Sequence, residues 1–183
     1  MRDGDDIHSL QFIAADGTKR FLPDGRVKGC YYLIGTEAEA KERGTLLICE
    51  GFATGATLRE ATGLPVVVCF TAGNLEPVAE FLHSNLKAVQ IIICGDFDKS
   101  GTGQKAATEA AQSVGGRVVL PDFTLEELSA DKPPSDFNDL AKLRGADAVE
   151  RAIEGASAPG WPDPQPLAAK VEPEPYPLDA LPD

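Results

Sequence analysis

Short apolar runs alternate with longer segments of helical spacing through the middle of the chain. Four of these runs have the length of buried strands: residues 45–50, 65–70, 89–96 and 117–121. Three helix-like segments separate them: residues 53–63, 76–86 and 101–116. Fully apolar strands that alternate with helices are typical of βαβ units, in which helices cover both faces of a parallel sheet. The pattern therefore predicts an α/β fold with a parallel four-stranded sheet flanked by helices.

The first 43 residues show a different pattern, which predicts a small β-hairpin region. Extended segments with aromatic and β-branched residues are separated by turns at residues 15–17 and 23–25, each of which ends in Asp-Gly. Four cations make this the locally basic part of the sequence: Lys19, Arg20, Arg26 and Lys28. Two interpretations stay open. The cations belong to solvated hairpin faces, or they form a basic flap that contacts template or nucleotide phosphates.

After the fourth predicted strand the chain becomes irregular and acidic, and two helix-like segments follow at residues 135–145 and 146–155. Residues 157–183 are rich in proline and acidic side chains, so they have too little apolar surface to fold alone. The length of 183 residues suits one hydrophobic core. The sequence thus predicts three parts: a hairpin region at 1–43, one α/β domain at 44–156 and a linker or tail at 157–183.

Composition limits the classes of function. The formal net charge of −12 argues against a broad basic face for nucleic acid, because phosphate contacts supply most of that affinity. The four cysteines have no CxxC spacing and the two histidines lie far apart, which argues against a zinc site. No apolar run approaches the roughly 20 residues of a membrane span, and no signal sequence is evident. We therefore expect a cytoplasmic protein.

Acidic residues follow the first and third predicted strands. Glu50 ends the first strand, and Asp96 and Asp98 follow the third. Ligands of parallel α/β sheets bind beyond the carboxyl ends of the strands, so neighbouring strands would bring these three carboxylates together. Carboxylates that close repel one another unless a cation lies between them, and oxygen ligands suit Mg²⁺ or Mn²⁺. The sequence therefore predicts a hard-metal site suited to phosphoryl or nucleotidyl transfer.

The segment after the two aspartates has features of a phosphate site. Lys99 and Lys105 flank residues 100–103 at the start of a predicted helix, where free backbone N–H groups favour anions. Each feature also has an ordinary alternative, because an Asp-X-Asp pair can form a turn or a helix cap and a glutamate can simply end a strand. Their conjunction at one sheet edge is what favours a metal and triphosphate site.

Two motifs resemble the Toprim family, which is shared by bacterial primases, topoisomerases and some nucleases. ICEGFATGATL (48–58) resembles its first motif, an apolar strand that ends in Glu-Gly. IIICGDFDKSGTGQKAA (91–107) resembles its second motif, an Asp-X-Asp followed by glycine and an Ala-rich helix. Residues 16–35 and 132–145 are similar to the subgroup found in plasmid- and phage-encoded primases and primase-helicases. The resemblance implies a Toprim-type, Rossmann-like sheet.

The resemblance also implies roles for the acids. Glu50 would be a general base or would orient the metal, and Asp96 and Asp98 would be Mg²⁺ ligands. Asp136 matches a downstream acid that joins the metal site, with Asn138 and Asp139 behind it. Asp136 equally fits the N-cap of the next predicted helix, so both interpretations stay open.

The same resemblance implies substrate contacts. Lys28, Lys99 and Lys105 would meet triphosphate oxygens. Asn74, in the segment TAGNL (71–75), would either contact substrate or cap the following helix. The implied function is a DNA primase that makes RNA primers on single-stranded DNA from nucleoside triphosphates during plasmid or phage replication, with a helicase beyond residue 183.

The sequence also departs from parts of that family. It has no zinc-ribbon cysteines before the domain, no Walker A pattern and no tyrosine in the setting of a cleavage nucleophile, which counts against a topoisomerase. Three alternatives remain: a Toprim nuclease, a non-catalytic module that holds a replication protein, and a phosphatase of the haloacid-dehalogenase type. The last class places an aspartate after its first strand, where this chain has Glu50.

Overall fold

The computed structural model describes residues 1–3 and 6–156, and the predicted tail at 157–183 lies outside them. Its centre is a five-stranded sheet in the order β5-β7-β6-β8-β9. The strands are β5 Tyr32–Ile34, β6 Thr45–Cys49, β7 Val66–Val68, β8 Gln90–Cys94 and β9 Arg117–Val119. Strands β7, β6, β8 and β9 run parallel to one another, as the sequence pattern predicted.

The sheet differs from the prediction at one edge, where β5 pairs with β7 in the antiparallel direction. The sheet is therefore mixed and has five strands. The sequence pattern assigned residues 32–34 to the hairpin region because they follow it directly. Their pairing partner, Val66–Val68, lies far along the chain, so no local pattern could reveal the contact.

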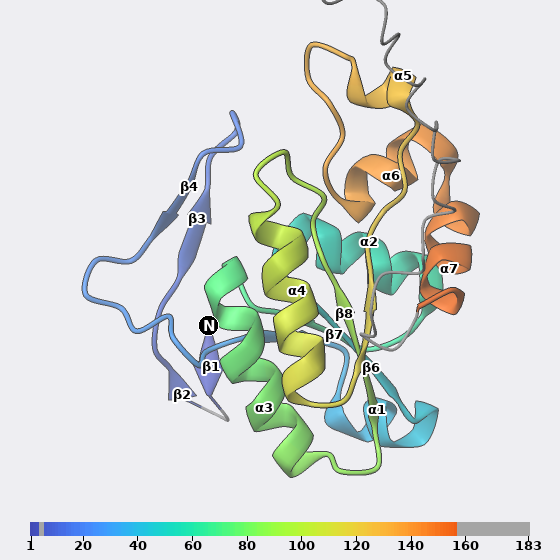
Figure 1. Ribbon diagram of the computed structural model, residues 1–183. Coiled ribbons are helices and arrows are strands. Elements are labelled where there is room, and N and C mark those ends of the chain that lie inside the picture. Colours follow the sequence, from blue (N-terminus) through green and yellow to red (C-terminus); the bar gives the residue numbers. More distant parts are fainter. Residues whose placement is uncertain (4–5, 157–183) are drawn as a thin grey trace, which may run out of the picture.

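Helices cover both faces of the sheet. They are α1 Glu37–Arg43, α2 Phe52–Thr62, α3 Leu75–Asn85, α4 Thr102–Ser113, α5 Leu125–Leu128, α6 Phe137–Arg144 and α7 Ala146–Glu154, with a short 3₁₀ turn, η1, at Ala72–Asn74. Helices α3 and α4 pack on one face and lie side by side in Figure 1. Helices α2, α6 and α7 pack on the other face. None of the helices formed by the described residues is long and apolar enough to cross a bilayer.

Successive strand residues serve the two faces in turn, as the period of a β-strand requires. In β6, Leu46 and Ile48 join the core under α3 and α4, whereas Leu47 and Cys49 join the core under α2, α6 and α7. All four cysteines are buried and free. Burial raises the pKa of the Cys49, Cys69 and Cys94 thiols, which makes them small apolar core groups and poor nucleophiles.

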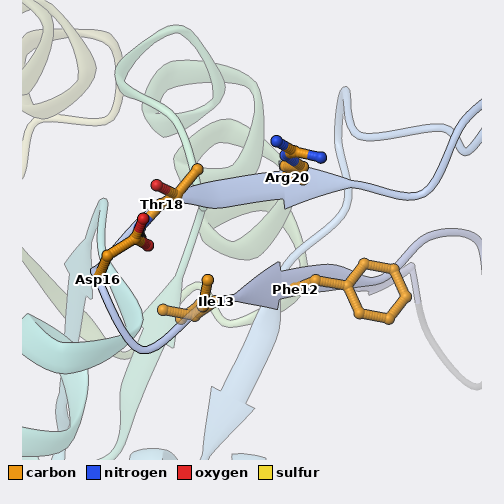
Figure 2. A pocket seen from close by; sticks show the side chains of 6 residues that line it. Phe12, Ile13, Asp16, Thr18 and Arg20 are labelled. Atoms are coloured by element: carbon orange, nitrogen blue, oxygen red, sulfur yellow. Dashed lines mark hydrogen bonds between the residues drawn. The ribbon is translucent and has the colours of Figure 1, made fainter.

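A small antiparallel hairpin region is present near the N-terminus, as predicted, and stands beside the sheet (Figure 1), but the range 1–43 given to it also contains β5 and α1. The hairpin region contains β1 Arg2–Asp3 paired with β2 Asp6–Ile7, and β3 Gln11–Ile13 paired with β4 Lys19–Phe21. The turn between β3 and β4 is held by Asp16, whose Oδ1 accepts a hydrogen bond of 2.9 Å from the backbone N–H of Thr18. Figure 2 shows this turn, with Phe12 and Arg20 at paired positions farther along the two strands.

Asn74 connects the hairpin region to the sheet. Its side chain is 2% exposed, and its Oδ1 accepts from the backbone N–H of Gly29 at 2.7 Å. Its Nδ2 donates to the carbonyl oxygens of Val27, Cys30 and Cys69. One amide thus satisfies backbone groups of the segment before β5 and of the end of β7. This fixes where the chain leaves the hairpin and enters the sheet.

We predict that Asn74→Ala lowers the free energy of unfolding by about 3 kcal/mol, because it leaves several buried backbone groups without partners. Urea denaturation measures the change. Asn85→Ala is a matched control, since its Nδ2 donates only to the Phe81 carbonyl on an exposed turn, and it should stay within about 0.5 kcal/mol of the wild type. Equal effects of the two substitutions would contradict the role of Asn74.

Candidate functional site

The pairing of β6 with β8 brings the predicted acids to one edge of the sheet. The two strands are parallel and in register from Thr45 opposite Gln90 to Cys49 opposite Cys94. Glu50 comes directly after β6, and Asp96 comes two residues after β8. The carboxyl ends of both strands therefore present an acidic side chain at the same rim, where ligands of parallel α/β sheets bind.

The electrostatics of these acids reflect their closeness. Burial raises the pKa of Asp96 to about 7, and repulsion from Glu50, Asp136 and Asp98 adds to the effect. Burial also raises the pKa of Glu50, with a further contribution from Asp98. Four carboxylates thus lie near enough to disfavour one another's charge. Of the acids that the sequence proposed, Glu50, Asp98 and Asp136 lie near enough to Asp96 to raise its pKa.

Asp136 reaches this rim through contacts made by two other segments. The backbone N–H of Phe97 donates to the Ser135 carbonyl at 2.6 Å, which fastens the loop before α6 beside the end of β8. Asp136 Oδ1 accepts from the backbone N–H of Asp139 at 2.8 Å, so this residue is the N-cap of α6. Its Oδ2 accepts from the Thr54 hydroxyl at 3.2 Å. The cap interpretation is therefore confirmed, and the same carboxylate still faces the acid cluster.

Asp98 is oriented by the start of α4. Its carboxylate accepts from the backbone N–H groups of Ser100 at 2.7 Å and Gly103 at 2.6 Å, and from the Ser100 hydroxyl. These hydrogen bonds lower the pKa of Asp98. A Cβ on Gly103 would lie 2.7 Å from the Asp96 carbonyl oxygen and 2.9 Å from Asp98 Oδ2, so only glycine fits there. Asp98 therefore serves as an anchor for the helix start as well as a member of the cluster.

The donor set fits a hard divalent cation. Asp96 Oδ1 is buried and has no hydrogen-bond partner in the described structure, which is the condition of a carboxylate oxygen that awaits a ligand. Within residues 1–3 and 6–156, no three His, Cys, Asp or Glu side chains are already arranged as a ligand set. Mg²⁺ typically takes only one or two protein carboxylates and completes its shell with water and phosphate oxygens. Asp96, supported by its acidic neighbours, meets that requirement.

Lys19 is a cation of the site that the sequence did not single out from its basic neighbours. It lies in β4, and its Nζ is 3.8 Å from the place where a Cβ on Gly51 would be. Its charge lowers the pKa of both Glu50 and Asp96. The hairpin thus holds one ammonium group beside the acid cluster. The sequence pattern could group Lys19 with three other cations but could not say which of them faces the acids.

The other predicted substrate residues are less central. Lys99 is exposed in the loop after Asp98, and Lys105 Nζ lies 3.7 Å from Glu109 Oε1 on the first turns of α4. Lys28 lines a pocket of about 370 Å³ beside Asn74. Asn74 occupies the N-cap position of α3, as one of the two interpretations predicted, but its side chain makes no cap hydrogen bond. Its amide is engaged instead by four backbone groups.

Two further residues at the rim were missed by sequence reasoning. Thr54, in the first turn of α2, is buried and donates to Asp136. Phe70 has a positive φ of 69°, which costs a non-glycine residue about 1–3 kcal/mol. The conformation is held by a 2.7 Å hydrogen bond from the Phe70 N–H to the Glu50 carbonyl. Neither feature has a signal in the sequence. The Thr54 contact joins the starts of α2 and α6, and the Phe70 contact joins the ends of β7 and β6.

Solved structures of primases have the same fold. The primase fragment of the bacteriophage T7 primase-helicase protein is 22% identical with a TM-score of 0.54, over 80% of this chain and 57% of that one. The Aquifex aeolicus primase, with its zinc-binding and RNA polymerase domains, is 23% identical with a TM-score of 0.54, over 81% of this chain and 36% of that one. The DnaG primase catalytic domain bound to single-stranded DNA has a TM-score of 0.50 at 18% identity, over 76% of this chain and 44% of that one.

Sequence relatives point the same way. Two Escherichia coli proteins named DNA primase TraC are 36% identical over 164 residues and 37% identical over 160 residues. These alignments cover 82% and 80% of this chain but only 16% and 11% of the relatives, so the chain spans a small part of their length. The Toprim domain family matches residues 45–147, the segment that carries β6 to α6 and every acid of the cluster. With the Glu-Gly end of β6 and the Asp-X-Asp after β8 at one rim, the chain belongs to the Toprim domain family.

Proposed function

We propose that this chain carries the catalytic site of a DNA primase, which makes short RNA primers on single-stranded DNA from nucleoside triphosphates with Mg²⁺ or Mn²⁺. The observation that carries the proposal is the buried, unpartnered Asp96 Oδ1 within a group of four carboxylates. The names of the relatives support it, since both TraC proteins are named DNA primase. The solved DnaG domain was bound to single-stranded DNA, which supports the choice of template.

In this proposal the acids divide the work according to their surroundings. Asp96 holds the metal directly, and Asp98 and Asp136 keep the charge around it negative while their hydrogen bonds fix their positions. A bound divalent cation would align the attacking hydroxyl and stabilise charge on the phosphates. Glu50, whose pKa is raised by burial, accepts the proton of the attacking hydroxyl, because a carboxylate with a raised pKa is a stronger base than a free one.

The cations supply the complementary half of the site. Lys19 lies at the acid cluster, Lys99 follows Asp98 in the loop before α4, Lys105 lies in the first turn of α4, and Lys28 lines a pocket beside Asn74. We assign Lys19 and Lys99 to triphosphate oxygens near the metal, and Lys105 and Lys28 to the outer phosphates or the template backbone. This local arrangement lets an acidic chain bind polyanions at one place without a basic face.

The biological setting follows from the same relatives. The T7 structure comes from a protein named primase-helicase, and we propose that a helicase domain or subunit acts together with this chain during plasmid or phage replication in the cytoplasm. The division into a hairpin region at 1–43, a Toprim domain at 44–156 and a linker at 157–183 is part of the same proposal. The family match over residues 45–147 supports a start of the Toprim domain near residue 44.

Asp96→Asn should reduce primer synthesis by more than about 100-fold, because it removes the negative oxygen that holds the metal. The assay follows incorporation of labelled ribonucleotides on a single-stranded template by the intact protein. Asp147→Asn, on the exposed first turn of α7, is the matched control and should retain full activity. Normal synthesis by the Asp96 variant would refute the assignment. Strand shortening in place of primer synthesis by the wild type would identify a nuclease.

The stability of the metal-free chain should fall as the pH rises. Asp96 has a pKa of about 7 in the folded chain against 3.8 for the free side chain, so the folded state holds a proton that the unfolded state releases. The stabilising effect is complete below about pH 4 and is lost as the pH rises through about 7. At about 1.4 kcal/mol per pKa unit, the loss amounts to at most about 4 kcal/mol.

Urea denaturation in a chelator at several pH values measures this loss. Asp96→Asn should flatten the pH dependence and make the metal-free chain more stable than the wild type at pH 8. Added Mg²⁺ at pH 8 should raise the stability of the wild type and leave the variant unchanged, because a ligand stabilises only a state that binds it. The same pH dependence in both proteins would show that Asp96 does not carry the raised pKa.

A further inference from the structure

An apolar pocket lies directly beside the acid cluster. Its volume is about 390 Å³, within the range of about 300–1,000 Å³ that is typical of small-molecule sites. Residues that line it come from the hairpin region, from β5, from the start of α2 and from the segment after β7: Met1, Leu10, Gln11, Ile13, Tyr32, Phe52 and Phe70. Three of these seven residues are aromatic. Phe52 comes two residues after Glu50, so the aromatic side of the pocket adjoins the acid cluster.

The aromatic side chains of this pocket are held open to solvent. Tyr32 is 44% exposed and Phe52 is 42% exposed, and their ring centroids lie 6.0 Å apart with an angle of 50° between the planes. Large aromatic groups usually contribute most when they are buried, so a pair left half-exposed at a pocket marks a binding surface. Phe70, in the same pocket, has the positive φ of 69° already described. Strained conformations of this kind are concentrated at functional sites.

The charged groups of the acid cluster and the apolar pocket lie next to each other along one face of the hairpin. Ile13 and Lys19 are paired across β3 and β4, so their side chains lie on the same face of the hairpin. Ile13 lines the pocket, while Lys19 lies beside Gly51. Gly51 is the residue between Glu50 and Phe52. A ligand that follows this order would place an anionic part at Lys19 and the metal-binding acids, and a flat apolar part against Phe52, Tyr32 and Phe70. A nucleotide has this order of parts.

We propose that the pocket formed by Tyr32, Phe52 and Phe70 binds a nucleobase by stacking, and that it positions the nucleotide whose phosphates lie at Lys19 and the acid cluster. This inference rests on the proposed function, since it uses the same phosphate end of the site. Base stacking on aromatic side chains tolerates all four bases. The pocket would therefore hold nucleotides without selecting among them, and base pairing with a template would supply the sequence.

The test compares ligands that have the same phosphates with and without a base. Titrations of the ¹⁵N-labelled chain with Mg-ATP and with magnesium tripolyphosphate, followed by NMR chemical shifts, give the two dissociation constants. The wild type should bind ATP about tenfold more tightly than tripolyphosphate, in line with one stacked base. The base-dependent shifts should fall on the backbone amides around Ile13, Tyr32, Phe52 and Phe70.

Phe52→Leu keeps an apolar side chain of similar size but removes the ring. This substitution should weaken ATP binding until its dissociation constant equals that for tripolyphosphate. The dissociation constant for tripolyphosphate should stay unchanged. Phe52→Tyr should restore the difference. Phe81→Leu is the matched control. Phe81 lies in α3, on the other face of the sheet, where it is 45% exposed and its ring contacts that of Tyr31. This substitution should change neither dissociation constant.

A decamer of thymidine distinguishes the two sources of a base. Loss of ATP affinity in Phe52→Leu assigns the pocket to the incoming nucleotide, whereas loss of decamer affinity alone assigns it to the template strand, and both outcomes support a nucleobase site. Equal affinities for ATP and tripolyphosphate, together with decamer binding that is indifferent to Phe52, would overturn the proposal. So would loss of the base-dependent shifts on deletion of residues 157–183, since residues outside the pocket would then be required to bind the base.

Failure of the pocket and failure of the proposed function remain separable. If Asp96→Asn abolishes primer synthesis while Phe52→Leu changes neither the ratio of the two constants nor the affinity for the decamer, the primase assignment stands and the pocket is refuted. If no primers form but the ratio depends on Phe52, the nucleobase pocket stands and the primase assignment falls.

Discussion

The parallel pairing of β6 with β8 is the contact on which the site depends. It places Glu50 and Asp96, which lie far apart in sequence, at one rim of the sheet. Burying Asp96 beside other acids costs free energy, first through desolvation and then through repulsion, and its raised pKa corresponds to roughly 4 kcal/mol at neutral pH and above. Six buried Leu and Ile side chains in the two strands contribute about 1.5–3 kcal/mol each. The packing of the strands therefore outweighs the cost of the buried acid at their ends.

Neighbouring segments complete the rim through backbone hydrogen bonds. The Phe97 N–H holds Ser135, and with it Asp136, beside the end of β8. Asn74 holds the segment that leaves the hairpin against the end of β7, and the hairpin in turn carries Lys19 to the acids. Because backbone groups make most of these contacts, they constrain the path of the chain more than the identity of each side chain. The side chains at the rim can therefore vary in chemistry without changing the path of the backbone.

Charge is distributed at two scales in this protein. Over the whole chain the net charge is −12, which disfavours non-specific binding to nucleic acid. At the rim, Lys19 stands next to the acid cluster, and an aromatic pocket adjoins it. An acidic composition over the whole chain is therefore compatible with a local site for a metal and an anion, which is where we propose that nucleotides bind.

The sequence alone determined the parallel order of strands and helices, the acids at the strand ends and the family motifs, because each is written in local periodicity or in a short run of residues. Only the tertiary structure decided that β5 joins the sheet, that Asn74 fastens the hairpin, that Lys19 is the cation at the acids and that Asp136 caps α6 while it faces them. Each of these depends on a contact between residues distant along the chain. The energy of such a contact comes from burial and hydrogen bonding in three dimensions, which no local pattern encodes.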